Sequence, residues 1–291
     1  MNAFLLSVSM CSMFAQNIIG KYAGNTFLRT NKEIYRFNAF AYAVCVLLFA
    51  IPAIGSAVSL YSIAMGIAFG ILTVLSGVYK LKALSTGPMS ITILITTSSM
   101  LIPALSGVVL FDEALRIPKI AAMAVLIGFI VLSVASPKQQ DGASARRRSV
   151  NTGWIVCCAV TFLSMGAIGV MQKVHQSSPH KDELFVFLTA AFLASLAVSS
   201  VVSCTGKATC TIRPRFVLLA VLSGVMTFTM NYLNLKLSGI IPSQIFFPVV
   251  NGGSIILSTV CSIVVFREKI TVRQAVGLCG GLLCLIAICL L

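Results

Sequence analysis

Acidic residues are scarce in this chain: its 291 residues include 7 Asp and Glu, against 21 Lys and Arg. Charged residues of both signs amount to only 10%, whereas about a quarter is usual in a soluble domain. This shortage of charge excludes a soluble domain of any size. Hydrophobic residues, at 58%, instead fall into runs that each approach the roughly 20 residues of a membrane-spanning helix. The runs cover residues 2–20, 37–55, 59–79, 88–111, 117–136, 153–171, 184–203, 214–235, 241–265 and 270–291.

Clusters that could carry catalysis or bind a metal are also lacking. All seven carboxylates fall in expected loops or at helix ends, and the two histidines, His175 and His180, fall in one expected loop. No nucleophile is placed beside a base, and no Cys/His or paired-carboxylate group is placed for chemistry near the membrane surface. We therefore expect neither an enzyme nor a cofactor.

The net charge of +14 does not indicate a nucleic-acid partner. The basic residues are scattered among short loops, and their only run is Arg146–Arg148, in the linker of residues 137–151. In a membrane protein an excess of Lys and Arg marks the cytoplasmic loops. Because most of these residues follow the odd-numbered runs, the charge rule places the linker in the cytoplasm and both termini outside.

A charged turn near the C-terminus has a counterpart in the first half of the chain. The segment VVLFDEALRIPKIAAMAVLIG (Val108–Gly128) aligns with IVVFREKITVRQAVGLCGGLL (Ile263–Leu283), and this places Glu113 on Glu268. Further matches occur in the same order along the chain. Ser12–Lys21 aligns with Ser164–Lys173, and Leu81–Ile91 aligns with Leu235–Ile245.

These matches predict an all-α polytopic membrane protein of ten transmembrane helices, built as two five-helix repeats. The repeats are residues 1–136 and 152–291, joined by the basic linker of residues 137–151. Because five is an odd number, the second repeat must cross the membrane in the opposite sense to the first. Inverted repeats of this kind build many secondary transporters, with the substrate site near the bilayer midplane where the repeats meet.

Each repeat ends in an F-x-E-x-[LI] turn, Phe111–Leu115 and Phe266–Ile270, followed by a last helix rich in small residues. In this respect the chain resembles EamA-type members of the drug/metabolite transporter superfamily, although Asp112 and Arg267 replace the Gly that usually precedes the Glu. The resemblance implies two inverted five-helix repeats and the export or exchange of small metabolites. It also implies cytoplasmic termini, which is the reverse of the charge rule. We expect Glu113 and Glu268 to serve the turn and the N-terminus of the next helix.

Polar side chains recur at helical spacing in six of the expected helices, in matching places of the two repeats. Because polar groups are costly against lipid, they indicate a cavity lined by the first, third, fourth, sixth, eighth and ninth helices. Amides are the stronger candidates, since hydroxyls in membrane helices often bond back to their own backbone. The expected substrate-binding residues are Ser12, Gln16, Thr73, Lys80, Ser90, Thr97, Ser164, Thr227, Asn231, Asn234, Gln244 and Asn251.

Two of these residues bear on the charge of the substrate. Lys80 is the one basic residue on a polar stripe, and it either holds a substrate carboxylate or phosphate or extends to the lipid headgroups. Gln16 lies on the first helix, where a proton-driven pump of the superfamily is expected to carry a carboxylate. Because an amide does not titrate, Gln16 favours a neutral or zwitterionic solute over proton-coupled export of a cation.

The leading interpretation is a secondary transporter, in a bacterial cytoplasmic (inner) membrane, that exports or exchanges a small metabolite by alternating access. The metabolite is expected to be amino acid-like or nucleobase- or nucleoside-like. A flippase for a polyprenyl-linked sugar headgroup is the alternative, and a membrane enzyme or receptor is a weaker one. Gly277 and Gly281 on the last helix allow close helix packing, either within a monomer or across a homodimer.

Overall fold

A computed structural model describes most of the chain as a bundle of helices. The described residues are 2–28, 30–103, 105–106, 118, 121–122, 124–125, 128–129, 152–205, 213–241, 243–267 and 271–290. Within these ranges the regular structure is helical and contains no strand. The α-helices are α1 (Asn2–Thr26), α2 (Asn31–Ala53), α3 (Leu60–Thr86), α4 (Met89–Thr97), α7 (Thr152–Gln176), α8 (Leu184–Cys204), α9 (Pro214–Ser238), α10 (Ser243–Val264) and α11 (Val272–Leu290); the 3-10 turns are η1 (Ser98–Met100) and η2 (Lys181–Glu183).

Most of the expected hydrophobic runs coincide with one of these helices. The run 117–136 lies largely outside the described residues, as do the linker 137–151 and the turn carboxylates Glu113 and Glu268. The start of α2 differs from the prediction, because the helix begins at Asn31 rather than at residue 37. Thr30 Oγ1 accepts a hydrogen bond from the Glu33 amide at 3.3 Å, while Glu33 Oε2 accepts one from the Thr30 amide at 2.8 Å. This capping box stabilises a polar first turn that hydropathy alone leaves out.

Among the described residues, five helical segments are long and apolar enough to cross a membrane: α2, α3, α7, α9 and Lys181–Cys204, which contains α8. Large apolar side chains are exposed on their outer faces, including Leu47 on α2 and Ile71 on α3. Contiguous exposure of this kind is unusual for a protein surrounded by water, whereas lipid accommodates it. These features support an integral membrane protein.

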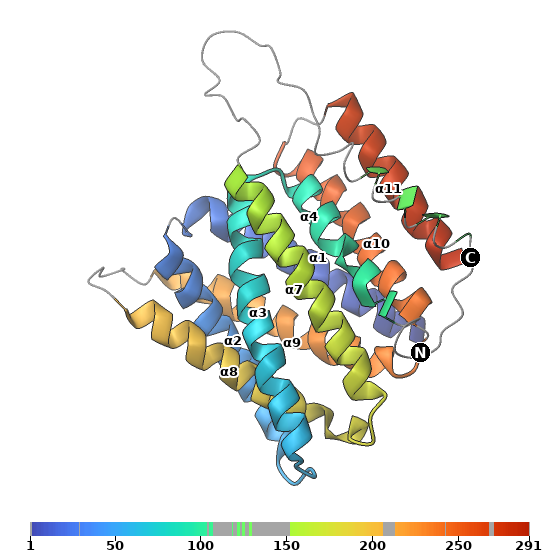
Figure 1. Cartoon of the computed structure of the whole chain (residues 1–291). Coiled ribbons are helices and arrows are strands. Elements are labelled where there is room, and N and C mark those ends of the chain that lie inside the picture. The colour runs from blue at the N-terminus through green and yellow to red at the C-terminus, as the bar shows by residue number, and fades with distance from the viewer. Residues whose placement is uncertain are drawn as a thin grey trace.

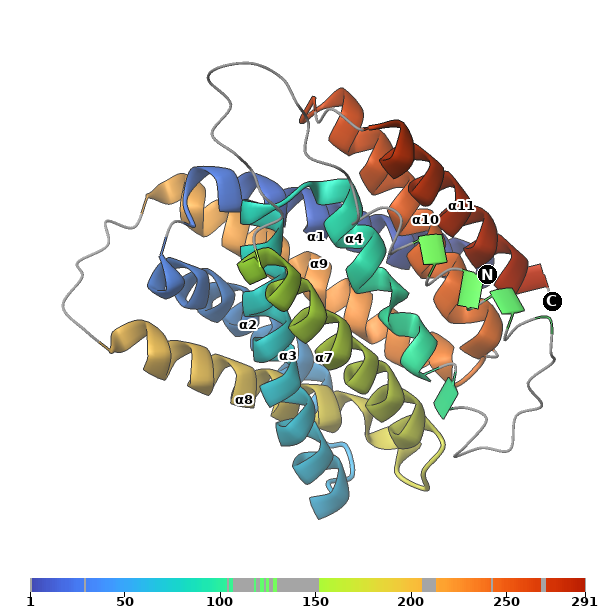
Figure 2. The same ribbon diagram turned by 45° about the horizontal axis from the view of Figure 1, so that its top comes forward.

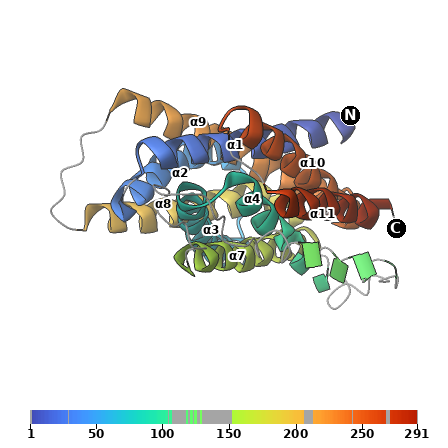
Figure 3. The ribbon, with the colours of Figure 1, turned by 90° about the horizontal axis from the view of Figure 1, so that it is seen from above.

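The helices lie in two connected groups around a shared centre. Helices α2 and α8 lie together at one side of the molecule, and α10 and α11 lie together at the opposite side (Figures 1 and 2). Seen from above, α1 and α9 lie on one face of the bundle, while α3 and α7 lie on the other (Figure 3). Helix α4 contacts both α7 and α10, and α11 packs on α10. Gly277 and Gly281 of α11 are buried within the single chain.

A glycine sets the distance between α3 and α8. A Cβ added at Gly70 would lie 2.2 Å from the carbonyl oxygen of Ala191, so the two backbones approach too closely for any side chain. The hydroxyl of Ser195 donates to Gly70 O at 2.9 Å and thereby joins the helices. This close packing of small residues is typical of helix pairs in membranes.

The same arrangement recurs between α9 and α2. A Cβ at Gly224 would lie 2.6 Å from the carbonyl oxygen of Ala41, and the Cys45 thiol lies 3.3 Å from Gly224 O as its donor. The repeat alignment that places Lys82 on Lys236 also places Gly70 on Gly224. The two glycine contacts therefore join equivalent helices of the two predicted repeats.

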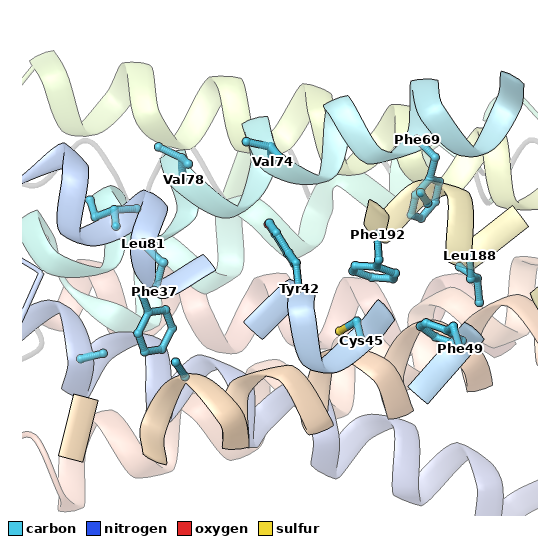
Figure 4. Close-up of a cluster of buried hydrophobic side chains, with 14 of the residues drawn as sticks. Phe37, Tyr42, Cys45, Phe49, Phe69, Val74, Val78, Leu81, Leu188 and Phe192 are labelled. Atoms are coloured by element: carbon cyan, nitrogen blue, oxygen red, sulfur yellow. The ribbon is translucent and has the colours of Figure 1, made fainter. Parts of the chain in front are cut away.

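Aromatic side chains fill the space where α2 meets α3 and α8 (Figure 4). The ring of Phe49 stacks on Phe192 at 5.5 Å between centroids, and Tyr42 contacts the same Phe192 ring at 5.8 Å. Such pairs contribute about 0.5–1.5 kcal/mol beyond the area that they bury. The cluster holds Tyr42 between α2 and α3, where its hydroxyl donates to Thr73 O at 3.2 Å.

Glu183, in the loop that precedes α8, caps the N-terminus of α3. Its Oε2 accepts hydrogen bonds from the Ser59 amide at 3.0 Å and from the Ser59 hydroxyl at 2.5 Å, and its Oε1 lies 3.0 Å from His180 Nδ1. A carboxylate at a helix N-terminus is favourable, because it pairs with amide groups that have no partner in the helix. Glu183 thus connects a helix of the first half to a loop of the second.

We expect Glu183→Ala to lower the melting temperature of the purified protein, because the amide at Ser59 loses a charged acceptor. Thermal unfolding in detergent, followed by circular dichroism, measures the change. The control is Asp182→Ala, which removes an exposed carboxylate from the neighbouring position. Equal melting temperatures for the two variants would show that the cap contributes nothing.

Candidate functional site

A cavity of about 150 Å³ lies at the centre of the bundle. Its wall comes from α1, α2, α3, α7, α9 and α10, and from the 3-10 turn and following residues at the end of α4. The sequence predicted every contributor except α2, which shows no stripe of polar residues. The polar wall residues are Gln16, Asn38, Tyr42, Thr73, Ser76, Lys80, Ser99, Gln172, Ser223, Thr227, Asn231, Asn234 and Asn251.

Seven of the residues predicted to bind substrate lie in this wall: Gln16, Thr73, Lys80, Thr227, Asn231, Asn234 and Asn251. Hydrogen bonds between the two halves of the chain hold several of them in place. Gln16 Nε2 donates to Thr227 Oγ1 at 2.7 Å, which joins α1 to α9. The Ser9 hydroxyl donates to Asn234 Oδ1, also at 2.7 Å, and joins the same two helices. The wall is therefore built in part by direct bonds across the centre of the bundle.

Three predicted residues, Ser12, Thr97 and Ser164, are buried but do not reach the cavity. The Ser12 hydroxyl donates to Val8 O at 2.8 Å, and the Thr97 hydroxyl donates to Ile93 O at 2.6 Å. Each hydroxyl thus has a hydrogen-bond partner within its own helix. A polar residue in such a row therefore needs no cavity to satisfy it. The side chains of Ser90 and Gln244 lie outside the described residues.

Six polar residues of the wall are not among the predicted substrate-binding residues: Asn38, Tyr42, Ser76, Ser99, Gln172 and Ser223. Asn38 and Tyr42 are four residues apart on α2 and therefore share one helix face. That spacing was a usable signal, but it spans only one turn of an otherwise apolar helix. Ser76 lies on α3 between Thr73 and Lys80, one turn from each, and Gln172 lies on α7, about two turns beyond Ser164.

The absence of a side chain at Gly77 gives α2 room to reach the cavity. A Cβ at Gly77 would lie 2.7 Å from the Tyr42 hydroxyl and 3.4 Å from Asn38 Nδ2. The hydroxyl of Tyr42 and the amide of Asn38 therefore cover α3 at this turn. Lys80 follows three residues later and lies on the same face of α3.

The wall carries a positive charge and, among the described residues, no carboxylate. Lys80 is its charged member, and it is partly buried. Asn38 is 6% exposed, and its Nδ2 has no hydrogen-bond partner. No described group of three His, Cys, Asp or Glu side chains could hold a metal ion. The site can therefore bind a small organic molecule through amides, hydroxyls and one ammonium group.

Equivalent positions of the two predicted repeats occur together in the wall. The alignment of Ser12–Lys21 with Ser164–Lys173 pairs three wall positions, and the alignment of Leu81–Ile91 with Leu235–Ile245, continued back along α3 and α9, pairs four more. The pairs are Met13 with Met165, Gln16 with Ile168, Gly20 with Gln172, Thr73 with Thr227, Ser76 with Met230, Gly77 with Asn231, and Lys80 with Asn234.

Comparison with known proteins identifies the fold but not a family. No family model matches the sequence, and no curated protein matches it. Among solved structures, 28 chains match. One of them, described only as a crystal structure of a protein, has a TM-score of 0.65 and 14% sequence identity. The similarity covers 97% of this chain and 98% of that chain, so the whole helical arrangement has a known counterpart.

Proposed function

We propose that this protein is a secondary transporter that exports or exchanges a small metabolite by alternating access, in a bacterial inner membrane. The proposal includes the finer architecture predicted from the sequence: ten helices in two inverted repeats of the EamA type. One observation carries it, the pairing of equivalent residues from both halves in one central cavity. Transporters built from inverted repeats bind their substrates where the repeats meet.

The packing of the helices supports the same proposal. Helix α3 packs on α7 and α8, and its counterpart α9 packs on α1 and α2. Helix α4 contacts α7, and its counterpart α10 contacts α1. Exchanging the two repeats therefore carries each of these helix contacts onto another of them. Two halves with equivalent contacts can exchange conformations, which is the structural basis of alternating access.

The end of α4 offers a place for such a movement. After Thr97 the helix narrows into the 3-10 turn η1, whose residues Ser99 and Met100 line the cavity. The hydroxyls of Thr96 and Ser98 donate to carbonyl oxygens of the preceding turn, at 2.9 and 2.7 Å. Back-bonding of this type bends helices, and a 3-10 stretch within a helix often marks a hinge. The change of helix type thus coincides with the site.

Counterflow into proteoliposomes tests the proposed function. Purified protein would be offered labelled neutral amino acids, nucleobases and nucleosides, one at a time, against the unlabelled solute inside. We expect saturable accumulation of at least one solute. We expect Gln16→Ala to reduce it about tenfold, because Gln16 contributes an amide to the site and a bond to Thr227.

Two threonines of α9 provide a matched comparison. Thr227 and Thr229 both donate their hydroxyls to carbonyl oxygens one turn earlier, at 2.7 and 2.9 Å, but only Thr227 lines the cavity. Thr227→Val should lower the flux, and Thr229→Val should leave it unchanged. If folded protein moves none of the solutes, or if both valine variants behave alike, the cavity is not the transport site.

A further inference from the structure

The charge of the cavity restricts what it can bind. An ammonium group that is partly removed from water is unfavourable unless an anion or several acceptors surround it. No described residue forms a hydrogen bond or ion pair with Lys80, and no described wall residue is acidic. Among the described residues, this cation within the cavity therefore has no counterion. A ligand that brings a negative charge would complete the pair.

A second donor without a partner lies close to this lysine. Asn38 Nδ2 is buried and has no acceptor, and the position of Gly77 places it one turn of α3 from Lys80. A buried donor that lacks an acceptor is unfavourable, so an acceptor supplied by a ligand would recover the lost energy. An ammonium and an amide N–H on one side of a cavity match the two oxygens of a carboxylate.

The repeat alignment shows that this feature belongs to one half only. Lys80 has Asn234 as its counterpart, and the Oδ1 of Asn234 already accepts the Ser9 hydroxyl. Aligning Phe37 and Ala41 with Phe187 and Ala191 gives Asn38 the apolar counterpart Leu188. The two halves therefore share a wall but differ in charge, and a ligand with one anionic end would bind in a single orientation.

The remainder of the wall is largely apolar and adaptable. Four methionines contribute to it: Met13, Met100, Met165 and Met230. Leu81, Leu84 and Ile168 extend the same surface. Methionine side chains adjust to apolar groups of different shapes, and this is common at sites that accept several related ligands. The wall thus provides space for an apolar side chain beside the two donors.

We propose that the cavity binds a small metabolite through a carboxylate, which Lys80 and Asn38 hold while the methionines surround an apolar tail. The inference rests on the proposed function and makes it more specific, since it favours an amino acid or a related carboxylic acid over a nucleobase. The ammonium group of an amino acid would find amide oxygens rather than a carboxylate. Lys80 is then a substrate-binding residue that fixes the orientation of the substrate.

The test compares each carboxylate with its own amide. Isothermal titration calorimetry on the detergent-solubilised protein would use L-leucine, 4-methyl-2-oxopentanoate and 4-methylpentanoate as probes, together with their primary amides and with 3-methylbutyl phosphate. We expect at least one carboxylate to bind about tenfold or more tightly than its amide. Lys80→Met should abolish that preference, Lys80→Arg should retain part of it, and Asn38→Leu should weaken it. The control is Lys236→Met, because Lys236 is an exposed lysine outside the cavity.

Several outcomes would overturn the proposal. Equal binding of carboxylate and amide, tighter binding of the phosphate ester, or no binding by any carboxylate would each exclude a carboxylate site. If Lys80→Met does not fold, each carboxylate is still compared with its amide on the wild-type protein, on Lys80→Arg and on Asn38→Leu. These measurements still test the proposal. Counterflow separates this result from the proposed function: saturable transport of a nucleobase that Lys80→Met leaves unchanged would refute the carboxylate site and retain the transporter.

Discussion

Replacement of Gly70 by leucine is expected to prevent the protein from folding. A Cβ at this position would lie 2.2 Å from the carbonyl oxygen of Ala191 and 3.0 Å from Ala194 Cβ. A backbone carbonyl cannot rotate away as a flexible side chain can, so α3 and α8 would have to separate. Their separation would break the bond from the Ser195 hydroxyl to Gly70 O and open the aromatic cluster of α2, α3 and α8. Overpacking a tight core by even a few atoms costs about 1–3 kcal/mol, and a leucine adds more than that.

Size-exclusion chromatography and thermal unfolding in detergent measure the effect. Gly70→Ala should fold with a lowered melting temperature, and Gly70→Leu should elute as an aggregate. Gly224→Leu should fail in the same manner, since Gly224 makes the equivalent contact with Ala41. Ala64→Leu is the control, because Ala64 is exposed on the same helix. A monodisperse Gly70→Leu protein with the wild-type melting temperature would contradict the close contact between α3 and α8.

The sequence contained enough information to predict the helices, because their apolar runs are long and uninterrupted. The predictions from sequence differ from the structure where short polar motifs mark features of a helix that hydropathy does not show. The start of α2 was placed too late, although Thr30 and Glu33 form the spacing of a capping box and predict a helix from Asn31. The run of residues 88–111 did not reveal a change of helix type: the hydroxyls from Thr96 to Ser98 bond to their own helix, α4 gives way to a 3-10 turn at Ser98, and residues 101–103 are again helical.

The candidate site was predictable only to the level of the helix. Rows of hydroxyl side chains indicate a polar helix face. The hydroxyls of Ser12 and Thr97, however, bond to backbone oxygens of their own helices and do not line a cavity. Amides carry a stronger signal, since they cannot all bond back to the helix, and Gln16, Asn231, Asn234 and Asn251 do reach the wall. The contribution of α2 has only a weak signal in the sequence, the spacing of Asn38 and Tyr42, because it depends on the space left by Gly77 on a different helix.

Even the amides are not all equivalent, and Asn17 shows why. Asn17 neighbours Gln16 in sequence, yet it is fully buried and lies outside the cavity. Its Nδ2 contacts the hydroxyls of Ser254 and Ser258 on α10, both at 3.3 Å. One residue along a helix rotates the side chain by about 100°, which turns it from the central space toward a neighbouring helix. Helical position therefore separates binding residues from packing residues only when the neighbouring helices are known.

Replacement of Ser76 by tryptophan is expected to reduce transport to background while the protein stays folded. Ser76 lines the cavity, and its hydroxyl donates only to Thr73 O of its own helix, at 3.0 Å. A larger side chain at this position would extend into the space that the substrate needs, because the cavity measures only about 150 Å³. The aligned position holds Met230, which also lines the wall, so Ser76→Met should fold and reduce the flux only in part.

Counterflow of whichever solute the wild-type protein accumulates measures this effect, so the result does not depend on knowing the natural substrate. Ala68→Trp is the matched control, because it places the same indole on an exposed face of α3 and should leave the flux unchanged. Thermal unfolding must show that all three variants are folded. Wild-type flux in folded Ser76→Trp would mean that solutes cross the protein by a route other than the central cavity. Background flux in folded Ser76→Trp, with wild-type flux in Ala68→Trp, would support a pathway through the cavity, whose wall includes α1, α3, α7 and α9.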